Sequence, residues 1–211
     1  VLRVDNLTGW DFTGQNLEGA SFENATVANA VLNGANVRGA SFAGTTWSGF
    51  IAPQLYSTAS YQARELQQIN LSSNVLSGWD LSGQNLMSAN LEFSTVSSAD
   101  LSGANLSGTG LFLSNLSSAS LVSAKLDGAN LVQANLRSAD LRGAFGGNFD
   151  DTSSTQNAIL PDGAIAGLDL KAGEQLVVRD DDGVPDPVPY AWQQPRPPIP
   201  VTVQPGATMD A

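Results

Sequence analysis

The sequence predicts an all-β fold in which the chain winds into a solenoid of short stacked segments. Three observations lead to this prediction. A large apolar residue recurs at every fifth position, a small residue usually stands two positions before it, and Asn or Asp often lies between them. This spacing fits neither the period of about 3.6 residues of an α-helix nor that of about 2 of a flat strand. It fits a chain that turns a corner every five residues, with the large and small residues pointing inward.

The five-residue pattern occurs in two series that differ in phase. The second series runs from Leu71 to Leu141, and Leu66 is assigned to it. Gly, Asn and Ser near the corners allow the chain to turn, and stacked coils then bond backbone to backbone at about 4.8 Å. The first series consists of Leu2, Leu7, Phe12, Leu17, Phe22, Val27, Leu32, Val37, Phe42 and Trp47.

The repeated phrases ANLSG, ADLSG and ANLRSADLRGA resemble the pentapeptide-repeat family, whose units have the pattern A(D/N)LXX. The resemblance covers residues 2–50 and about 66–145 and rests on about 25 units. It implies a right-handed quadrilateral β-helix with four pentapeptides per coil. On this basis the chain forms roughly six coils with a length of about 30 Å.

The pattern divides the chain into blocks. Block one is predicted at 1–50 and block two at 66–145, with an insert at 51–65 between them. Pro53 suits the first turn of a helix, and apolar residues follow it at helical spacing. We therefore expect a short helix over about 53–62.

The five-residue period ends after Leu141. Residues 146–211 contain short apolar runs separated by turn signals, and residues 185–200 are rich in Pro. The end of a solenoid exposes unpaired strand edges, so we expect this segment to be a β-rich cap. The expected strands are Ala158–Leu160, Ile165–Leu170, Gln175–Val178 and Ile199–Val203.

A nine-residue phrase occurs twice, as GWDFTGQNL at 9–17 and GWDLSGQNL at 78–86. Each copy places a Trp in an inward slot that elsewhere holds Ala and is too small for an indole. We expect Trp79 to pack the insert onto the solenoid, and Trp10 by analogy to follow an earlier insert that this chain lacks. The N-terminus is then cut from a longer array with a unit of about 69 residues. A role in stacking on a ligand is the alternative, and the residues assigned to structural packing are Trp10, Trp79, Leu55 and Tyr56.

The phrase and the segment QLYSTASYQARELQQINL also resemble long secreted planctomycete-type bacterial proteins in which such units recur. This resemblance implies an extracellular or cell-surface location in bacteria. The absence of Cys fits a secreted bacterial protein.

The composition offers little for catalysis. There is no His or Cys, and no spacing of Ser with a base indicates a nucleophile. No apolar run approaches the length of about 18 residues that suggests a membrane span. Asp180, Asp181, Asp182 and Asp186 form an acidic cluster that is either a solvated turn or a Ca²⁺ site. We expect no enzyme activity and no other cofactor.

Four units per coil would stack residues that are 20 apart in the sequence. Phe93, Phe112, Leu113 and Val132 would then form an apolar stripe on one face. Either the insert or the C-terminal segment covers this stripe, or it contacts another protein.

These observations favour a non-enzymatic structural or surface protein, a rigid scaffold or filament subunit. Its expected partner is protein, through self-association or within a longer parent chain, and not nucleic acid directly. The alternative is a DNA mimic that interacts with DNA gyrase, as some pentapeptide-repeat proteins do. The net charge of −11 arises mainly in the C-terminal segment, since residues 1–146 carry ten acidic and six basic side chains. The rod therefore lacks the dense negative charge that mimicry requires.

Overall fold

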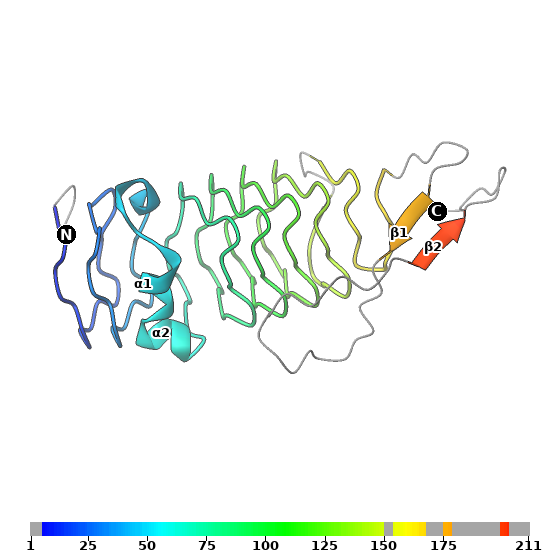
Figure 1. The fold of residues 1–211 in the computed structure, drawn as a ribbon. Coiled ribbons are helices and arrows are strands. Elements are labelled where there is room, and N and C mark those ends of the chain that lie inside the picture. The colour runs from blue at the N-terminus through cyan, green and yellow to red at the C-terminus, as the bar shows by residue number, and fades with distance from the viewer. Residues whose placement is uncertain (1–5, 150–153, 168–174, 179–198, 203–211) are drawn as a thin grey trace. The chain divides into compact units, whose positions relative to one another are not determined.

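The computed structural model describes residues 6–149, 154–167, 175–178 and 199–202. The chain divides into two compact units, Val1–Gly167 and Leu168–Ala211. The first is a solenoid of stacked coils, interrupted by helices (Figure 1).

Parallel backbone bridges between residues 20 apart hold the coils together. Asn85 bridges Asn105, and Asn90 bridges Gly110. Along block two such bridges recur at every fifth residue, so successive pentapeptides occupy successive sides of the coil. This arrangement agrees with the four-sided β-helix that the family resemblance implies.

Each corner is a tight turn that begins at the central apolar residue. The carbonyl of Leu101 accepts a hydrogen bond of 3.0 Å from the N–H of Ala104. Between them Gly103 has a φ of 64°, a conformation that favours Gly or Asn. Asp100 Oδ1 accepts a bond of 2.9 Å from the N–H of Ser102. The Asn or Asp of the repeat thus supports the corner that follows it.

The core is a column of central apolar residues, and this column is aromatic where the two blocks meet. Phe22 stacks on Phe42 with ring centroids 4.9 Å apart, and Phe42 stacks on Phe50 at 4.5 Å. Phe50 then contacts Trp79 at 5.7 Å. Aromatic pairs at such distances add about 0.5–1.5 kcal/mol to the burial of their surface. The column therefore joins block one to block two.

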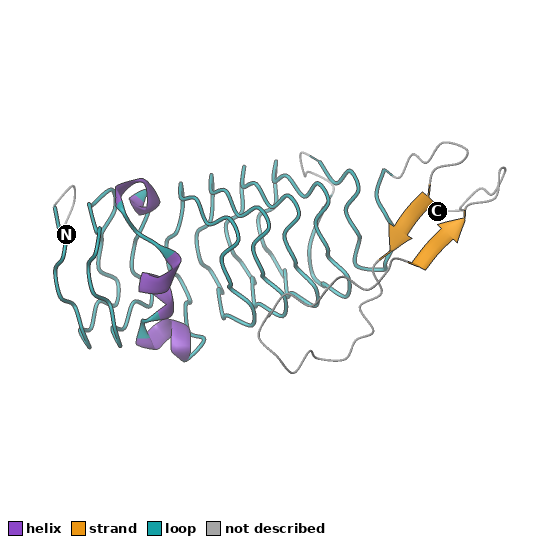
Figure 2. Cartoon of the chain, in the orientation of Figure 1, coloured by secondary structure: helices purple, strands orange, loops and turns teal. Residues whose placement is uncertain are grey.

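The coil between the blocks is longer than the others and contains three short helices. Ser41 bridges Asn70, a separation of 29 residues. A 3-10 helix, η1 (Thr45–Ser48), precedes α1 (Ala52–Tyr56) and α2 (Ala59–Gln62). Figure 2 shows these helices in purple between the teal coils.

The single helix predicted over about 53–62 is wrong, because the structure has two helices there. Thr58 is extended, with a ψ of 149°, and separates α1 from α2. Its Oγ1 accepts the N–H of Tyr61 at 3.1 Å and so caps α2. Thr favours such a cap over a helix interior because its hydroxyl bonds to nearby backbone groups.

Trp47 also departs from the prediction. The five-residue phase places it inward, but its side chain is 78% exposed. The reason is η1, which begins at Thr45 and changes the direction of the following side chains. Phe50 occupies the core instead.

The solenoid continues beyond residue 146, where the cap was predicted to begin. Ser154 bridges Asn135, and Ile159 bridges Asp140. The bridges need only backbone groups, so they persist where the five-residue side-chain pattern has ended. The division between the two units falls after Gly167.

The second unit contains a small antiparallel pair. β1 (Gln175–Val178) pairs with β2 (Ile199–Thr202). Residues 179–198, which hold most of the Pro-rich segment, lie outside the described residues. The role of this unit as a cap stays a prediction.

Candidate protein-interaction site

The four residues of the apolar stripe lie along one corner of the solenoid. The N–H of Phe93 donates to the carbonyl of Phe112 at 3.0 Å, and that of Leu113 donates to the carbonyl of Val132 at 3.1 Å. The rings of Phe93 and Phe112 meet edge to face at 5.6 Å. Phe93, Leu113 and Val132 are 54%, 45% and 40% exposed, and Phe112 is partly buried. The stripe is therefore continuous and open to solvent.

Two stripe residues occupy a strained backbone position. Phe93 has a φ of 58° and Leu113 a φ of 54°. The corresponding corner positions elsewhere hold mainly Gly, Ser or Asn. The left-handed conformation costs an L-residue about 1–2 kcal/mol, and it is unusual for a bulky side chain. Stability alone would place Gly or Asn at these two positions.

The two tryptophans of the repeated phrase have different surroundings. Trp79 is 8% exposed and lies edge-on to Tyr56 of α1, with ring centroids 6.3 Å apart. Leu55, also on α1, is fully buried. Trp10 is 52% exposed, and its ring lies 5.9 Å from that of Phe12. The insert therefore packs on Trp79, while the indole of Trp10 is open to solvent.

Two tyrosines fasten the insert to the backbone of the second phrase. Tyr56 Oη accepts the N–H of Asp80 at 2.6 Å, and Tyr61 Oη donates to the carbonyl of Asp80 at 2.9 Å. Burial raises the pKa of both phenols above the ordinary value. Both are therefore neutral at physiological pH and act as hydrogen-bonding groups.

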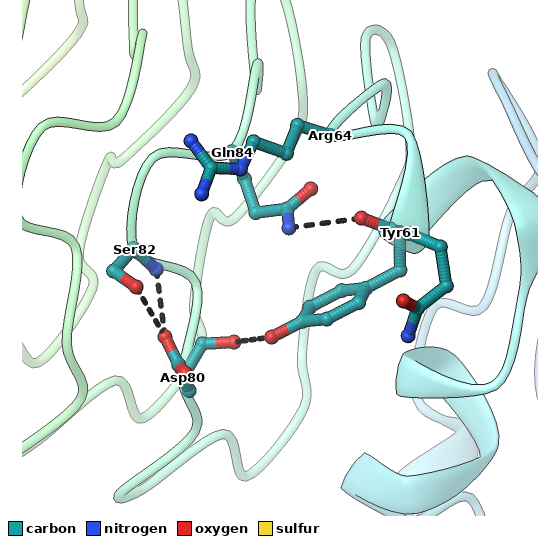
Figure 3. A pocket seen from close by; sticks show the side chains of 6 residues that line it. Tyr61, Arg64, Asp80, Ser82 and Gln84 are labelled. Atoms are coloured by element: carbon teal, nitrogen blue, oxygen red, sulfur yellow. Dashed lines mark hydrogen bonds between the residues drawn. The ribbon is translucent and has the colours of Figure 1, made fainter. Parts of the chain in front are cut away.

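A polar pocket of about 240 Å³ lies beside this contact (Figure 3). Gln84 Nε2 donates to the carbonyl of Tyr61 at 3.1 Å at its edge. Asp80 Oδ1 accepts bonds from the N–H and the hydroxyl of Ser82. The bond from Gln84 holds the insert against the phrase, while the bonds between Asp80 and Ser82 lie within the phrase itself. The pocket is lined by Tyr61, Gln62, Arg64, Asp80, Ser82 and Gln84.

A buried amide that the sequence pattern does not predict anchors α1. Gln54 Nε2 donates to the carbonyls of Val27 and Ala30, both at 2.8 Å. Its Oε1 accepts the N–H of Ile51 at 2.9 Å. Gln is common on exposed helix faces, so its position in the sequence gave no signal of burial. Tyr61 was missed for a similar reason, because its partner is a backbone group.

The predicted Ca²⁺ ligands Asp180, Asp181, Asp182 and Asp186 lie outside the described residues. Within the residues that are described, no group of three or more His, Cys, Asp or Glu side chains is arranged to hold a metal. No helix in the described part of the chain has the length and apolar character needed to cross a membrane.

Opposite charges lie close together on the solenoid. Glu18 pairs with Arg38 at 3.6 Å. Lys125 pairs with Asp127 at 3.7 Å, and Arg142 with Asp140 at 2.7 Å. Paired surface charges of this kind contribute little to stability, but they reduce the local negative potential.

The family model for pentapeptide repeats matches eight copies, at residues 6–45, 65–108 and 114–145. These matches span more than half of the sequence. The chain belongs to the pentapeptide repeat family. No curated protein matches the sequence.

Solved structures of pentapeptide repeat proteins resemble parts of this chain. One, from the Arabidopsis thaliana thylakoid lumen, is 23% identical over 64% of this chain and 66% of that chain, with a TM-score of 0.26. Another, from Nostoc PCC 7120, is 38% identical over 41% of this chain and 69% of that chain, with a TM-score of 0.29. QnrB1, a plasmid-mediated fluoroquinolone resistance protein, is 22% identical over 80% of this chain and 88% of that chain, with a TM-score of 0.34.

Proposed function

We propose that this pentapeptide repeat protein is a non-enzymatic scaffold that acts through protein contacts, with the apolar stripe as its contact surface. The observation that carries the proposal is the pair of bulky residues, Phe93 and Leu113, at left-handed positions. Both backbone geometry and contact with water disfavour these side chains there. Strain that is kept at an exposed surface supports a role in binding.

The partner we propose is a second copy of the chain. The stripe runs along the direction in which coils stack, at about 4.8 Å per coil. Two copies related by a two-fold axis could therefore place their stripes against each other. A two-fold contact through the stripe alone closes at a dimer, so growth into a filament or a matrix would need a second contact, such as stacking of coil ends. We propose an extracellular or cell-surface location, which the resemblance of the repeated phrase to secreted bacterial repeat arrays supports.

The test is the molar mass in solution, measured by light scattering coupled to size exclusion over a series of concentrations. The double variant Phe93→Asn, Leu113→Asn removes apolar surface and keeps the corners intact, because Asn tolerates the left-handed conformation. Met87→Asn is the matched control, since Met87 is exposed but lies at another corner.

We expect the wild-type mass to rise with concentration, the double variant to stay monomeric and the control to behave like the wild type. A wild-type protein that is monomeric throughout the series would contradict self-association. Equal association of the double variant would show that the contact lies elsewhere.

The alternative function, mimicry of DNA, requires dense unpaired negative charge along the solenoid. The carboxylates of Glu18, Asp127 and Asp140 are instead paired with basic groups. We expect no inhibition or protection of DNA gyrase in a supercoiling assay.

A further inference from the structure

The second phrase, residues 78–86, is a docking site for the two-helix insert. Its distinguishing residues each contact the insert: the indole of Trp79 contacts Phe50 and Tyr56, and Gln84 donates to the carbonyl of Tyr61. The backbone N–H and carbonyl of Asp80 bond to the hydroxyls of Tyr56 and Tyr61. In most of the other coils, backbone groups of the preceding coil make these hydrogen bonds. At Asp80 the two Tyr hydroxyls make them instead.

The first phrase, residues 9–17, has the same backbone. Gly9 and Gly78 have φ angles of 72° and 70°, and Gly14 and Gly83 have φ angles of 65° and 61°. In both phrases the Asp accepts the N–H of the residue two positions later. Geometry that holds the insert at the second phrase is therefore also present at the first.

The groups that hold the insert are open at the first phrase. Trp10 is 52% exposed, compared with 8% for Trp79, and Gln15 is exposed where Gln84 is buried. Within the described residues, neither the N–H nor the carbonyl of Asp11 makes a backbone hydrogen bond. The phrase thus presents an exposed indole, an exposed amide and, within the described residues, the unpaired backbone N–H and carbonyl of Asp11.

We infer that residues 9–17 dock a second two-helix segment with the chemistry of residues 50–62. Such a segment carries a Phe and a Tyr to cover the indole of Trp10. Two Tyr hydroxyls five residues apart pair with the N–H and carbonyl of Asp11, and a backbone carbonyl accepts from the amide of Gln15. This contact lies at the end of the solenoid and is independent of the apolar stripe.

The experiment places a second insert before the first phrase. Residues 1–69 are fused ahead of the full chain, which keeps the five-residue phase because Leu2 corresponds to Leu71. Trp47 and Trp192 are replaced by Phe throughout, as is Trp10 of the added block. The remaining indoles are then Trp10 and Trp79 of the full chain, and quenching of their fluorescence by iodide reports which is exposed. The full chain with Trp47 and Trp192 replaced by Phe is the reference.

In the reference chain we expect iodide to quench about half of the emission, from Trp10. In the fused chain the quenchable fraction falls to near zero and the emission shifts to shorter wavelength. Quenching of Trp10 that is unchanged by the fusion would overturn the inference.

A second fusion separates docking of helices from simple stacking of coils. Here residues 91–129, which contain repeats but neither the insert nor a Trp, precede the full chain in the same phase and Trp background. We expect Trp10 to stay quenchable, since its indole does not fit over an Ala-lined coil. If the plain repeats protected Trp10 equally well, the site would not be specific for helices.

The tyrosine contact is tested in the first fusion. Changing Tyr56 and Tyr61 of its added insert to Phe should restore part of the quenching, and no change would contradict the tyrosine contact.

Discussion

Gly49 and Gly103 both have left-handed backbones, with φ angles of 94° and 64°, but their surroundings differ. A Cβ at Gly103 would meet no atom within 4 Å, whereas a Cβ at Gly49 would lie 2.6 Å from Ala28 Cβ and 2.7 Å from its Cα. We expect Gly103→Ala to lower the free energy of unfolding by about 1–2 kcal/mol, from conformation alone. Gly49→Ala adds a clash with the backbone and should cost about 1–3 kcal/mol more. Urea denaturation measures both, and equal losses would show that the coil at Ala28 adapts.

At the scale of the element, the anchoring of α1 depends on the buried amide of Gln54. Gln54→Glu would place a carboxylate against the carbonyls of Val27 and Ala30. Loss of two buried hydrogen bonds and burial of a charge should lower the free energy of unfolding at pH 7 by about 3–5 kcal/mol. Gln62→Glu is the control, because Gln62 also donates to a carbonyl but is exposed. Its expected effect is within about 0.5 kcal/mol.

The loss from Gln54→Glu should depend on pH. Burial raises the pKa of the new carboxyl above its unfolded value of about 4.3, so the unfolded chain releases its proton first. Relative to the wild type, the variant is then most stable below about pH 4, and its loss of stability grows as the pH rises. Urea denaturation at pH 4 and pH 7 measures the difference, and a pH-independent loss would contradict a buried carboxylate.

The tyrosines of the insert predict a second pH dependence. Burial raises the pKa of Tyr61 above its ordinary value. Unfolded Tyr ionises near pH 10, so above about that pH the unfolded chain loses a proton that the folded chain keeps. The contribution of Tyr61 to stability is therefore present below about pH 10 and is lost above it. Denaturation at pH 8 and pH 11 should show a smaller decline for Tyr61→Phe than for the wild type. An equal decline would mean that the phenol does not contribute.

The structure of the repeats could be predicted from the sequence more fully than that of the insert. The repeats were predictable because most units place the same residue types at the same inward positions, as at Leu101 and Leu121. The insert was less predictable, because its two helices are separated by a single cap at Thr58 and its contacts are mostly with backbone carbonyls. The exposed Trp47 illustrates the limit: a five-residue phase holds only while the chain stays in the coil.

At the scale of the whole molecule, stability should be nearly additive over the coils. Each coil bonds to the coils on either side of it through bridges between residues 20 apart, such as Asn85 and Asn105. In an arrangement of this kind neighbouring units interact and distant units do not. Removal of one complete coil should therefore leave the remaining contacts intact.

Two deletions test this independence of the coils. Deleting 91–110 joins Asn90 to Leu111 and keeps every later residue in its slot, so the solenoid should unfold cooperatively with a lower m-value in urea. Deleting 91–108 shifts Leu111 from the core to a corner and exposes the central residues beyond it. Each such Leu loses about 1.5–3 kcal/mol of burial, which block two cannot sustain over several units. We expect the second variant to lose its cooperative transition. If both variants unfolded with the same midpoint and m-value, the five-residue phase would not determine which side chains form the core.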